Sequence, residues 1–92
     1  MAKLTDKEIK QKLKGLPDWR HVGKEITKKF KLKDFKEAIS FVNKVADLAE
    51  AANHHPDIVI NYNVVTLTLS THSQGGVTEN DIKLARQIEK AS

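Results

Sequence analysis

The sequence of 92 residues has no cysteine, two prolines and four glycines, and aromatic residues make up 5% of it. Without cysteine there is no disulfide framework, no thiolate nucleophile and no cysteine-type zinc site, a pattern that fits a cytoplasmic protein. No apolar run reaches the roughly 18 residues that a membrane-spanning helix needs. Residues 1–14 are charged throughout and have no apolar centre, so we expect no signal peptide.

Basic residues outnumber acidic ones in the first half of the chain and are scarce in the second half. Residues 1–46 carry 13 Lys and Arg against 6 Asp and Glu, and residues 47–92 carry 3 against 6, for a net charge of +4. A basic half can attract an anion, so an anion- or nucleic-acid-binding module is one interpretation. Because the lysines spread over several expected elements with almost no arginine among them, a solvated lysine surface is the simpler one, and nucleic acid is not the expected partner.

With 39% hydrophobic and 30% charged residues, the chain has the composition of a folded protein, and we interpret residues 1–92 as one domain. Three capping boxes, each a Thr or Asp followed three residues later by an acid, predict three helix starts. They begin at Thr5, Asp34 and Thr78. We expect the first helix to end near residues 15–17. The second, a core helix of about 20 residues, should end at His55, because Pro56 has no amide proton and displaces the preceding residue from the helical region.

Alternating apolar and polar residues predict four strands in two hairpins. The first hairpin lies within residues 19–32 with its turn at Gly23-Lys24, and the second follows Pro56 with its turn at Tyr62-Asn63. In the second hairpin one face is expected to hold Ile58, Ile60 and Tyr62, another Val65, Leu67 and Leu69, and the polar face Thr66, Thr68, Ser70 and His72. Since hairpins pair antiparallel, the predicted fold class is α+β. Its order is α-β-β-α-β-β-α, with three helices packed on one face of a four-stranded antiparallel sheet.

Three of the four histidines fall where expected elements end, and side chains at such ends gather into sites. His54 and His55 close the second helix and His72 ends the last strand, whereas His21 lies in the first hairpin and is interpreted as a surface residue. Carboxylates accompany the three histidines. These are Glu50, one helical turn before His54, Asp57, and Asp81 at the start of the last helix.

Each of these side chains also has a purely structural interpretation. A single histidine is more often a hydrogen-bonding residue than a catalyst, Glu50 suits an exposed helix face, and Asp81 is also the acid of the last capping box. A zinc site is a further alternative, but neighbouring rings on a helix diverge by about 100°, so His54 and His55 do not form a simple ligand pair. We therefore expect no metal.

The spacing of these residues resembles the signature of the pterin-4a-carbinolamine dehydratase family. In chain order the matching positions are Glu50, His54, His55, Pro56, Tyr62, His72 and Asp81. Residues 30–38, 53–57, 70–73 and 76–78 also look like that family, so the resemblance covers nearly the whole chain.

The resemblance implies a dehydratase that removes water from 4a-hydroxytetrahydropterin to give the quinonoid dihydropterin, in the recycling of the pterin that aromatic amino-acid hydroxylases use. It implies a pterin substrate, no metal or organic cofactor, a homodimer or homotetramer, and a hydroxylase as pathway partner. Animal members of the family also act as the dimerisation cofactor of a nuclear transcription factor. A protein-binding role, as a transcriptional cofactor or an assembly factor, is therefore the alternative function.

By the same resemblance, the catalytic residues are His54, His55 and His72, and Glu50 and Asp81 match the family's carboxylates. Substrate binding or orientation is assigned to Glu50, Asp57, Asp81, Ser70 and Thr71.

Dehydration needs a proton delivered to the leaving oxygen and a proton removed from a ring nitrogen, and an imidazole near pH 7 can do either. At a helix C-terminus with Glu50 one turn away, His54 is expected to be the general acid. His72 is then the base, or the acid for the other stereoisomer, and His55 binds and orients the ring. Three nearby imidazoles should titrate as a coupled set.

Overall fold

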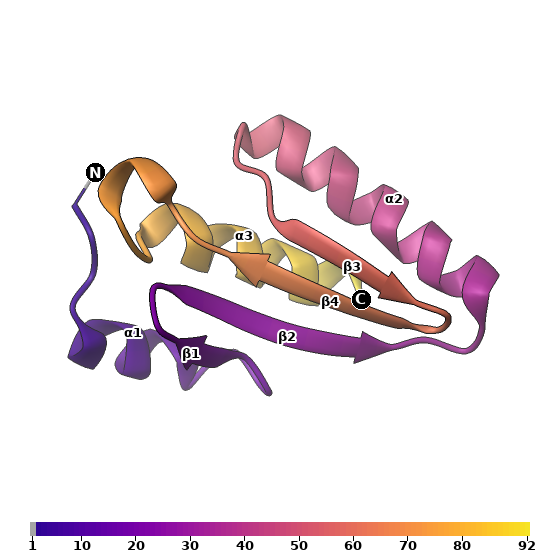
Figure 1. Cartoon of the computed structure of the whole chain (residues 1–92), viewed down its shortest axis with the longest axis horizontal. Coiled ribbons are helices and arrows are strands. Elements are labelled where there is room, and N and C mark those ends of the chain that lie inside the picture. Colours follow the sequence, from indigo (N-terminus) through magenta and orange to yellow (C-terminus); the bar gives the residue numbers. More distant parts are fainter. Residues whose placement is uncertain (1) are drawn as a thin grey trace.

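Residues 2–92 are described by a computed structural model; Met1, with which the predicted domain begins, lies outside them. Three helices accompany a four-stranded antiparallel sheet, which confirms the predicted fold class and element order (Figure 1). The elements are α1 (Asp6–Leu13), β1 (Arg20–Val22), β2 (Glu25–Lys31), α2 (Phe35–Ala52), β3 (Asp57–Asn61), β4 (Val64–Leu69), the short 3-10 helix η1 (His72–Gln74) and α3 (Glu79–Ala91). Among the described residues, none of the helices combines the length and the apolar character that crossing a membrane requires.

Both predicted hairpins are present, and they join side by side in one sheet. The strand order is β1-β2-β4-β3, so the two central strands come from different hairpins. Strands β2 and β4 pair antiparallel from Ile26 opposite Leu69 to Lys31 opposite Val64. Strand β1 is therefore one edge of the sheet and β3 the other.

One face of the sheet carries the core, because alternate residues of the central strands point to it. On β4 these are Val65, Leu67 and Leu69, which are 0% exposed, as predicted. The apolar stripes of the helices cover this face, and α3 runs behind β4 in the view of Figure 1. The buried residues of α2 and α3 that pack there are Ala38, Phe41, Val45, Ala49, Ile82, Leu84, Ala85 and Ile88.

The helices begin at the predicted caps, but α2 ends earlier than expected. Its last residue is Ala52, and Asn53 adopts the left-handed conformation with φ of 50°. Asparagine tolerates this conformation better than most residues do and is a known helix stop. The His54 amide then donates to the Ala49 carbonyl at 3.1 Å, which closes the helix end. The predicted end at His55 is therefore wrong, since Asn53 and not Pro56 stops the helix.

The predicted face of Ile58, Ile60 and Tyr62 is only partly correct. All five residues of β3 are exposed, with Ile58 and Ile60 each 37% and Val59 58% exposed, because this strand lies at the edge of the sheet. Tyr62 is not on the strand: it occupies the β3–β4 turn with φ of 53° and is 64% exposed.

The predicted place of His72 on the polar face of the last strand is also wrong. Strand β4 ends at Leu69, and His72 begins η1. The chain folds back at this point because the Thr71 amide donates to the Gly76 carbonyl at 2.9 Å, which closes a short loop. The period-two pattern therefore stops before it reaches His72.

Candidate active site

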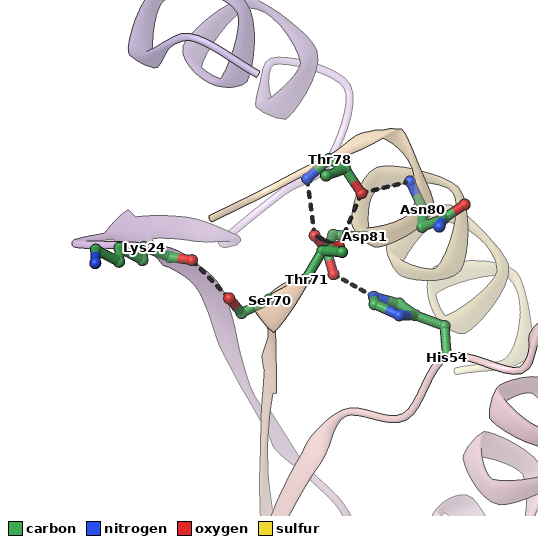
Figure 2. Close-up of polar contacts among 7 residues, drawn as sticks. All are labelled: Lys24, His54, Ser70, Thr71, Thr78, Asn80 and Asp81. Atoms are coloured by element: carbon green, nitrogen blue, oxygen red, sulfur yellow. Dashed lines mark hydrogen bonds and ion pairs between the residues drawn. The ribbon is translucent and has the colours of Figure 1, made fainter. Parts of the chain in front are cut away.

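The carboxylate of Asp81 is the centre of the site. Asp81 lies in the first turn of α3 and is 0% exposed. Its Oδ1 lies 2.5 Å from Nε2 of His54, and its Oδ2 accepts hydrogen bonds from the Thr71 hydroxyl at 2.8 Å and the Thr78 amide at 2.9 Å (Figure 2). A buried carboxylate is tolerated when it is paired and hydrogen-bonded in this way. The acid that caps α3 therefore also holds a histidine ring.

Three distant stretches of chain bring these groups together. His54 follows the left-handed turn at the end of α2, Thr71 follows β4, and Thr78 is the N-cap of α3. The loop between the last two is short because Thr71 pairs with Gly76. Gly75 takes the left-handed conformation that this loop requires, with φ of 72°. The site thus depends on the end of α2, the end of β4 and the start of α3 meeting at one end of the sheet.

The ring of His54 lies in the wall of a groove. Its side chain is 14% exposed. The groove has a volume of about 180 Å³ and is lined by Ala52, His54, Asn80, Lys83, Leu84 and Gln87. A carboxylate bound to one ring nitrogen fixes the orientation and the tautomer of an imidazole, and it stabilises the imidazolium when that forms. Since Nε2 of His54 contacts Asp81, Nδ1 is the nitrogen that remains for proton exchange.

Glu50 does not support His54 as the sequence predicted. Its Oε2 lies 2.5 Å from Nε2 of His55, and both side chains are largely exposed. The one-turn relation between Glu50 and His54 requires a helix that continues through His54, and the turn at Asn53 ends it first. The helical-face argument is therefore wrong, and His54 takes its carboxylate from α3.

The other predicted site residues are spread around this cluster. The Ser70 hydroxyl donates to the Lys24 carbonyl at 2.9 Å and so ties the end of β4 to the β1–β2 turn (Figure 2). His72 is exposed at the start of η1, next to Thr71 in the chain, and Asp57 is exposed at the start of β3. Within residues 2–92 no hydrogen bond joins one of the three histidine rings to another. The structure thus unites His54, Asp81 and Thr71 and sets the Glu50–His55 pair apart.

One residue of the cluster was interpreted from the sequence as a helix cap in a stretch that looks like the family, but it was not assigned to the site. Thr78 is 0% exposed, and its hydroxyl lies 2.8 Å from that of Thr71. A signal was available, because the acid of its capping box, Asp81, is also a signature residue of the family that the sequence resembles. Because Asp81 is both the acid of the capping box and a signature residue, the N-cap residue Thr78 is also expected to lie at the site.

Metal binding finds no support in the arrangement of side chains. In the part of the chain that the structure describes, no three His, Cys, Asp or Glu side chains converge as ligands of one ion.

The fold and the site define a small α+β domain in which a buried carboxylate holds a histidine beside a groove. The chain belongs to the pterin 4 alpha carbinolamine dehydratase family, whose model matches residues 2–91. This confirms the resemblance found in the sequence.

Several relatives are similar over the full length. A Cyanothece protein named "Putative pterin-4-alpha-carbinolamine dehydratase" is 54% identical over 89 residues, which are 97% of this chain and 92% of that one. A protein of the same name from Sulfurisphaera tokodaii is 47% identical over 90 residues, 98% of this chain and 97% of that one. A crystal structure of a transcriptional coactivator/pterin dehydratase from Brucella melitensis is 43% identical, covers 97% of both chains and superposes with a TM-score of 0.93.

A more distant structure shares the fold alone. It is a pterin dehydratase-like protein identified as a RuBisCO assembly factor in the alpha-carboxysome, with 19% identity and a TM-score of 0.66 over 79% of this chain and 84% of that one.

Proposed function

We propose that the chain is a hydro-lyase that removes water from a 4a-hydroxytetrahydropterin and gives the quinonoid dihydropterin. Membership of the family supports this reaction class. The observation that carries the assignment is the contact between His54 and the buried Asp81 in the wall of a groove. An imidazole held beside a cavity is suited to proton transfer with a bound heterocycle.

The proposed chemistry is a balanced pair of proton transfers. The C4a–O bond breaks and the leaving hydroxide takes one proton to become water, while a ring nitrogen loses one proton as the C=N bond forms. No oxidation state changes, so the proposal requires neither a metal nor an organic cofactor. Nδ1 of His54 is the proposed acid, and His72 is the proposed base, or the acid for the other stereoisomer. Each transfer can contribute about 10²–10⁴-fold to the rate.

The remaining candidates are proposed to bind or orient the substrate. His55, steadied by its exposed carboxylate partner, would contact the ring, and Asp57 is accessible at the start of β3. The hydroxyls of Ser70 and Thr71 already bond within the protein. Their proposed contribution is therefore indirect: Ser70 shapes the loop, and Thr71 acts through the buried carboxylate.

A stopped-flow assay of carbinolamine decay tests the function directly. Wild type should accelerate dehydration above the buffer rate, and His54→Ala or His72→Ala should lower turnover at least tenfold while circular dichroism shows an intact fold. His21→Ala is the matched control, because this histidine lies in β1 outside the site. Wild type without acceleration would refute the dehydratase, and two folded variants of near-normal rate would refute the histidine assignment.

We propose that the chain acts as a homodimer or homotetramer. The support is the edge strand β3, which presents unpaired backbone together with the exposed side chains of Ile58, Val59 and Ile60. Antiparallel pairing of β3 with its copy around a two-fold axis would cover this edge. Light scattering of wild type and Val59→Lys tests it: a monomeric wild type would overturn the proposal, and a smaller particle for the variant would support it.

The proposed substrate carries a hydroxyl at C4a, which a hydroxylation that consumes tetrahydropterin leaves behind. An aromatic amino-acid hydroxylase in the cytoplasm is therefore the proposed pathway partner.

The alternative function is a protein-binding role on the same fold. The coactivator and assembly-factor descriptions of the two solved structures favour it. The two functions separate experimentally, because a His54→Ala variant without dehydratase activity would still capture a dimerising helix from a partner if binding were the function.

A further inference from the structure

Two buried threonine hydroxyls lie behind the carboxylate that holds His54. Thr78 is 0% and Thr71 9% exposed. Their hydroxyl oxygens lie 2.8 Å apart, and the Thr71 hydroxyl donates to Oδ2 of Asp81 at 2.8 Å. The Thr78 hydroxyl oxygen also accepts the Asn80 amide at 3.2 Å (Figure 2). The Asn80 amide, the two threonine hydroxyls and the Asp81 carboxylate form one continuous hydrogen-bond chain. It leads from the backbone of α3 to the carboxylate.

The direction of every hydrogen bond in this hydrogen-bond chain follows from the donors and acceptors that its groups carry. An ionised carboxylate only accepts, and a hydroxyl has a single hydrogen. The Thr71 hydrogen is committed to Asp81, so the oxygen of Thr71 must accept from Thr78. The Thr78 hydroxyl therefore donates to Thr71 and accepts from the Asn80 amide, whose position the helix fixes. Neither hydroxyl can reverse without breaking a buried bond, which is costly.

The carboxylate at the end of this hydrogen-bond chain determines which nitrogen of His54 is available, and the hydroxyls behind it hold the carboxylate in place. Oδ2 of Asp81 is occupied by two donors, so Oδ1 is left to accept the Nε2–H of His54. A neutral His54 held in this way has its lone pair on Nδ1. Cooperative buried networks of this kind hold a geometry more firmly than isolated pairs do.

We infer that Thr78 is a positioning residue: through Thr71, its hydroxyl holds the Asp81 carboxylate that orients the His54 ring, so that Nδ1 stays available for proton exchange and the neutral ring keeps its hydrogen on Nε2. The inference rests on the proposed function for its effect on rate, but not for its effect on the ring. Loss of the contacts that orient a metal-bound histidine typically lowers activity about 10–100-fold, and we expect the lower end of this range for Thr78. Turnover should fall while substrate affinity stays nearly constant, since Thr78 is buried and does not line the groove.

The test combines ¹⁵N NMR of the His54 ring, at a pH where the ring is neutral, with dehydration kinetics. Wild type should show the Nε2–H tautomer. Thr78→Val, which keeps the shape and removes the hydroxyl, should show mixed tautomers and about tenfold lower kcat with little change in KM. Thr78→Ser should recover both, because it restores the hydroxyl.

Two further variants separate positioning from helix capping. Thr71→Val cuts the same chain but leaves the cap of α3 in place, so it should reproduce the NMR change even if Thr78→Val does not fold. Thr5→Val removes the equivalent hydroxyl from the capping box of α1, which has no hydrogen bond to Thr71, Thr78 or Asp81, and should leave the tautomer and kcat unchanged. An unchanged tautomer in a folded Thr78→Val or Thr71→Val would overturn the inference. A wild type without dehydratase activity would refute the proposed function alone, because the ring signal would still report on the threonines.

Discussion

Two histidine–carboxylate pairs of equal length lie near the end of α2, and they differ in burial. The ring nitrogen is 2.5 Å from the carboxylate oxygen in both His54–Asp81 and His55–Glu50. The side chains are 14% and 0% exposed in the first pair but 57% and 77% exposed in the second. Solvent screens the outer pair, whereas breaking the inner one leaves a buried group without its partner. The distance does not distinguish the two pairs, and their surroundings do.

The other hydrogen bonds of the two carboxylates also distinguish the buried His54–Asp81 pair from the exposed His55–Glu50 pair. The Asp81 carboxylate also accepts a hydroxyl and a backbone amide, both from buried residues. Within residues 2–92 the Glu50 carboxylate pairs only with His55. Long exposed side chains lose entropy when they hold one geometry. The inner pair is therefore preorganised for proton transfer, and the outer pair is suited to adapt to a substrate.

The largest effect is expected when the inner pair is broken. Asp81→Asn keeps the size of the side chain but turns one acceptor oxygen into a donor, which faces His54 or the two donors from the loop. The free energy of unfolding should fall by about 3–5 kcal/mol, and turnover by about 100-fold. Urea denaturation and the dehydration assay measure both. A variant as stable as wild type would mean that the buried carboxylate does not hold the site together.

The Lys28–Glu89 ion pair has an intermediate burial, so breaking it should lower the free energy of unfolding by an intermediate amount. Glu89 on α3 accepts the Trp19 indole N–H at 2.9 Å and pairs with Lys28, whose ammonium lies 4.6 Å from the centre of the Phe30 ring. The Lys28 and Glu89 side chains are 11% and 19% exposed. Glu89→Gln should therefore lower the free energy of unfolding by about 1.5 kcal/mol, the lower range for a hydrogen bond to a charged group, without changing kcat.

The matched control for Glu89→Gln is Glu79→Gln on the same helix. Glu79 pairs with Lys12 at 2.6 Å, but the two side chains are 35% and 33% exposed. Its replacement should change the free energy of unfolding by less than about 0.5 kcal/mol. Equal losses for the two variants would show that burial does not set the value of these pairs.

A small effect is expected when the outer histidine pair is broken. Glu50→Gln removes the charge partner of His55 in a solvated setting, so urea denaturation should detect a change below about 0.5 kcal/mol. The effect on turnover should be smaller than that of His54→Ala. A loss of stability comparable to that of Asp81→Asn would remove the distinction between the two pairs.

The sequence predicted most of the fold because its signals are local. Caps at Thr5, Asp34 and Thr78 and the alternation through Val65, Leu67 and Leu69 act within a few residues, and the structure confirms all of them. The exposure of β3 was not predictable from its pattern, since it depends on which strand becomes the edge of the sheet. Strand order is a property of the whole chain rather than of one segment.

The site was predicted less accurately because its contacts are not local. The helical spacing of Glu50 and His54 suggested a pair, but the left-handed Asn53 changed the direction of the chain, so that His54 pairs with Asp81 and Glu50 pairs with His55. Thr78 and Thr71 lie seven residues apart, and nothing in their spacing shows that their hydroxyls meet. Contacts between segments of this kind require the coordinates.

The smallest effect on stability is expected at the Thr5–Glu8 capping box of α1, which is the exposed counterpart of the Thr78–Asp81 capping box. In α1 the Thr5 amide donates to the Glu8 carboxylate at 2.9 Å, and the Glu8 amide donates to the Thr5 hydroxyl at 3.1 Å. The backbone hydrogen bond from Thr5, followed by the Thr5 side chain, lowers the pKa of Glu8 below its ordinary value of 4.5. A lowered pKa in the folded state means that this contribution to stability is complete above the unfolded value and is lost as the pH falls through the folded one. Hydrogen exchange of the α1 amides should therefore accelerate in wild type as the pH falls below about 4.5, relative to Glu8→Gln, in which the group does not titrate. Equal pH dependence in the two proteins would show that the Glu8 carboxylate does not stabilise the start of α1.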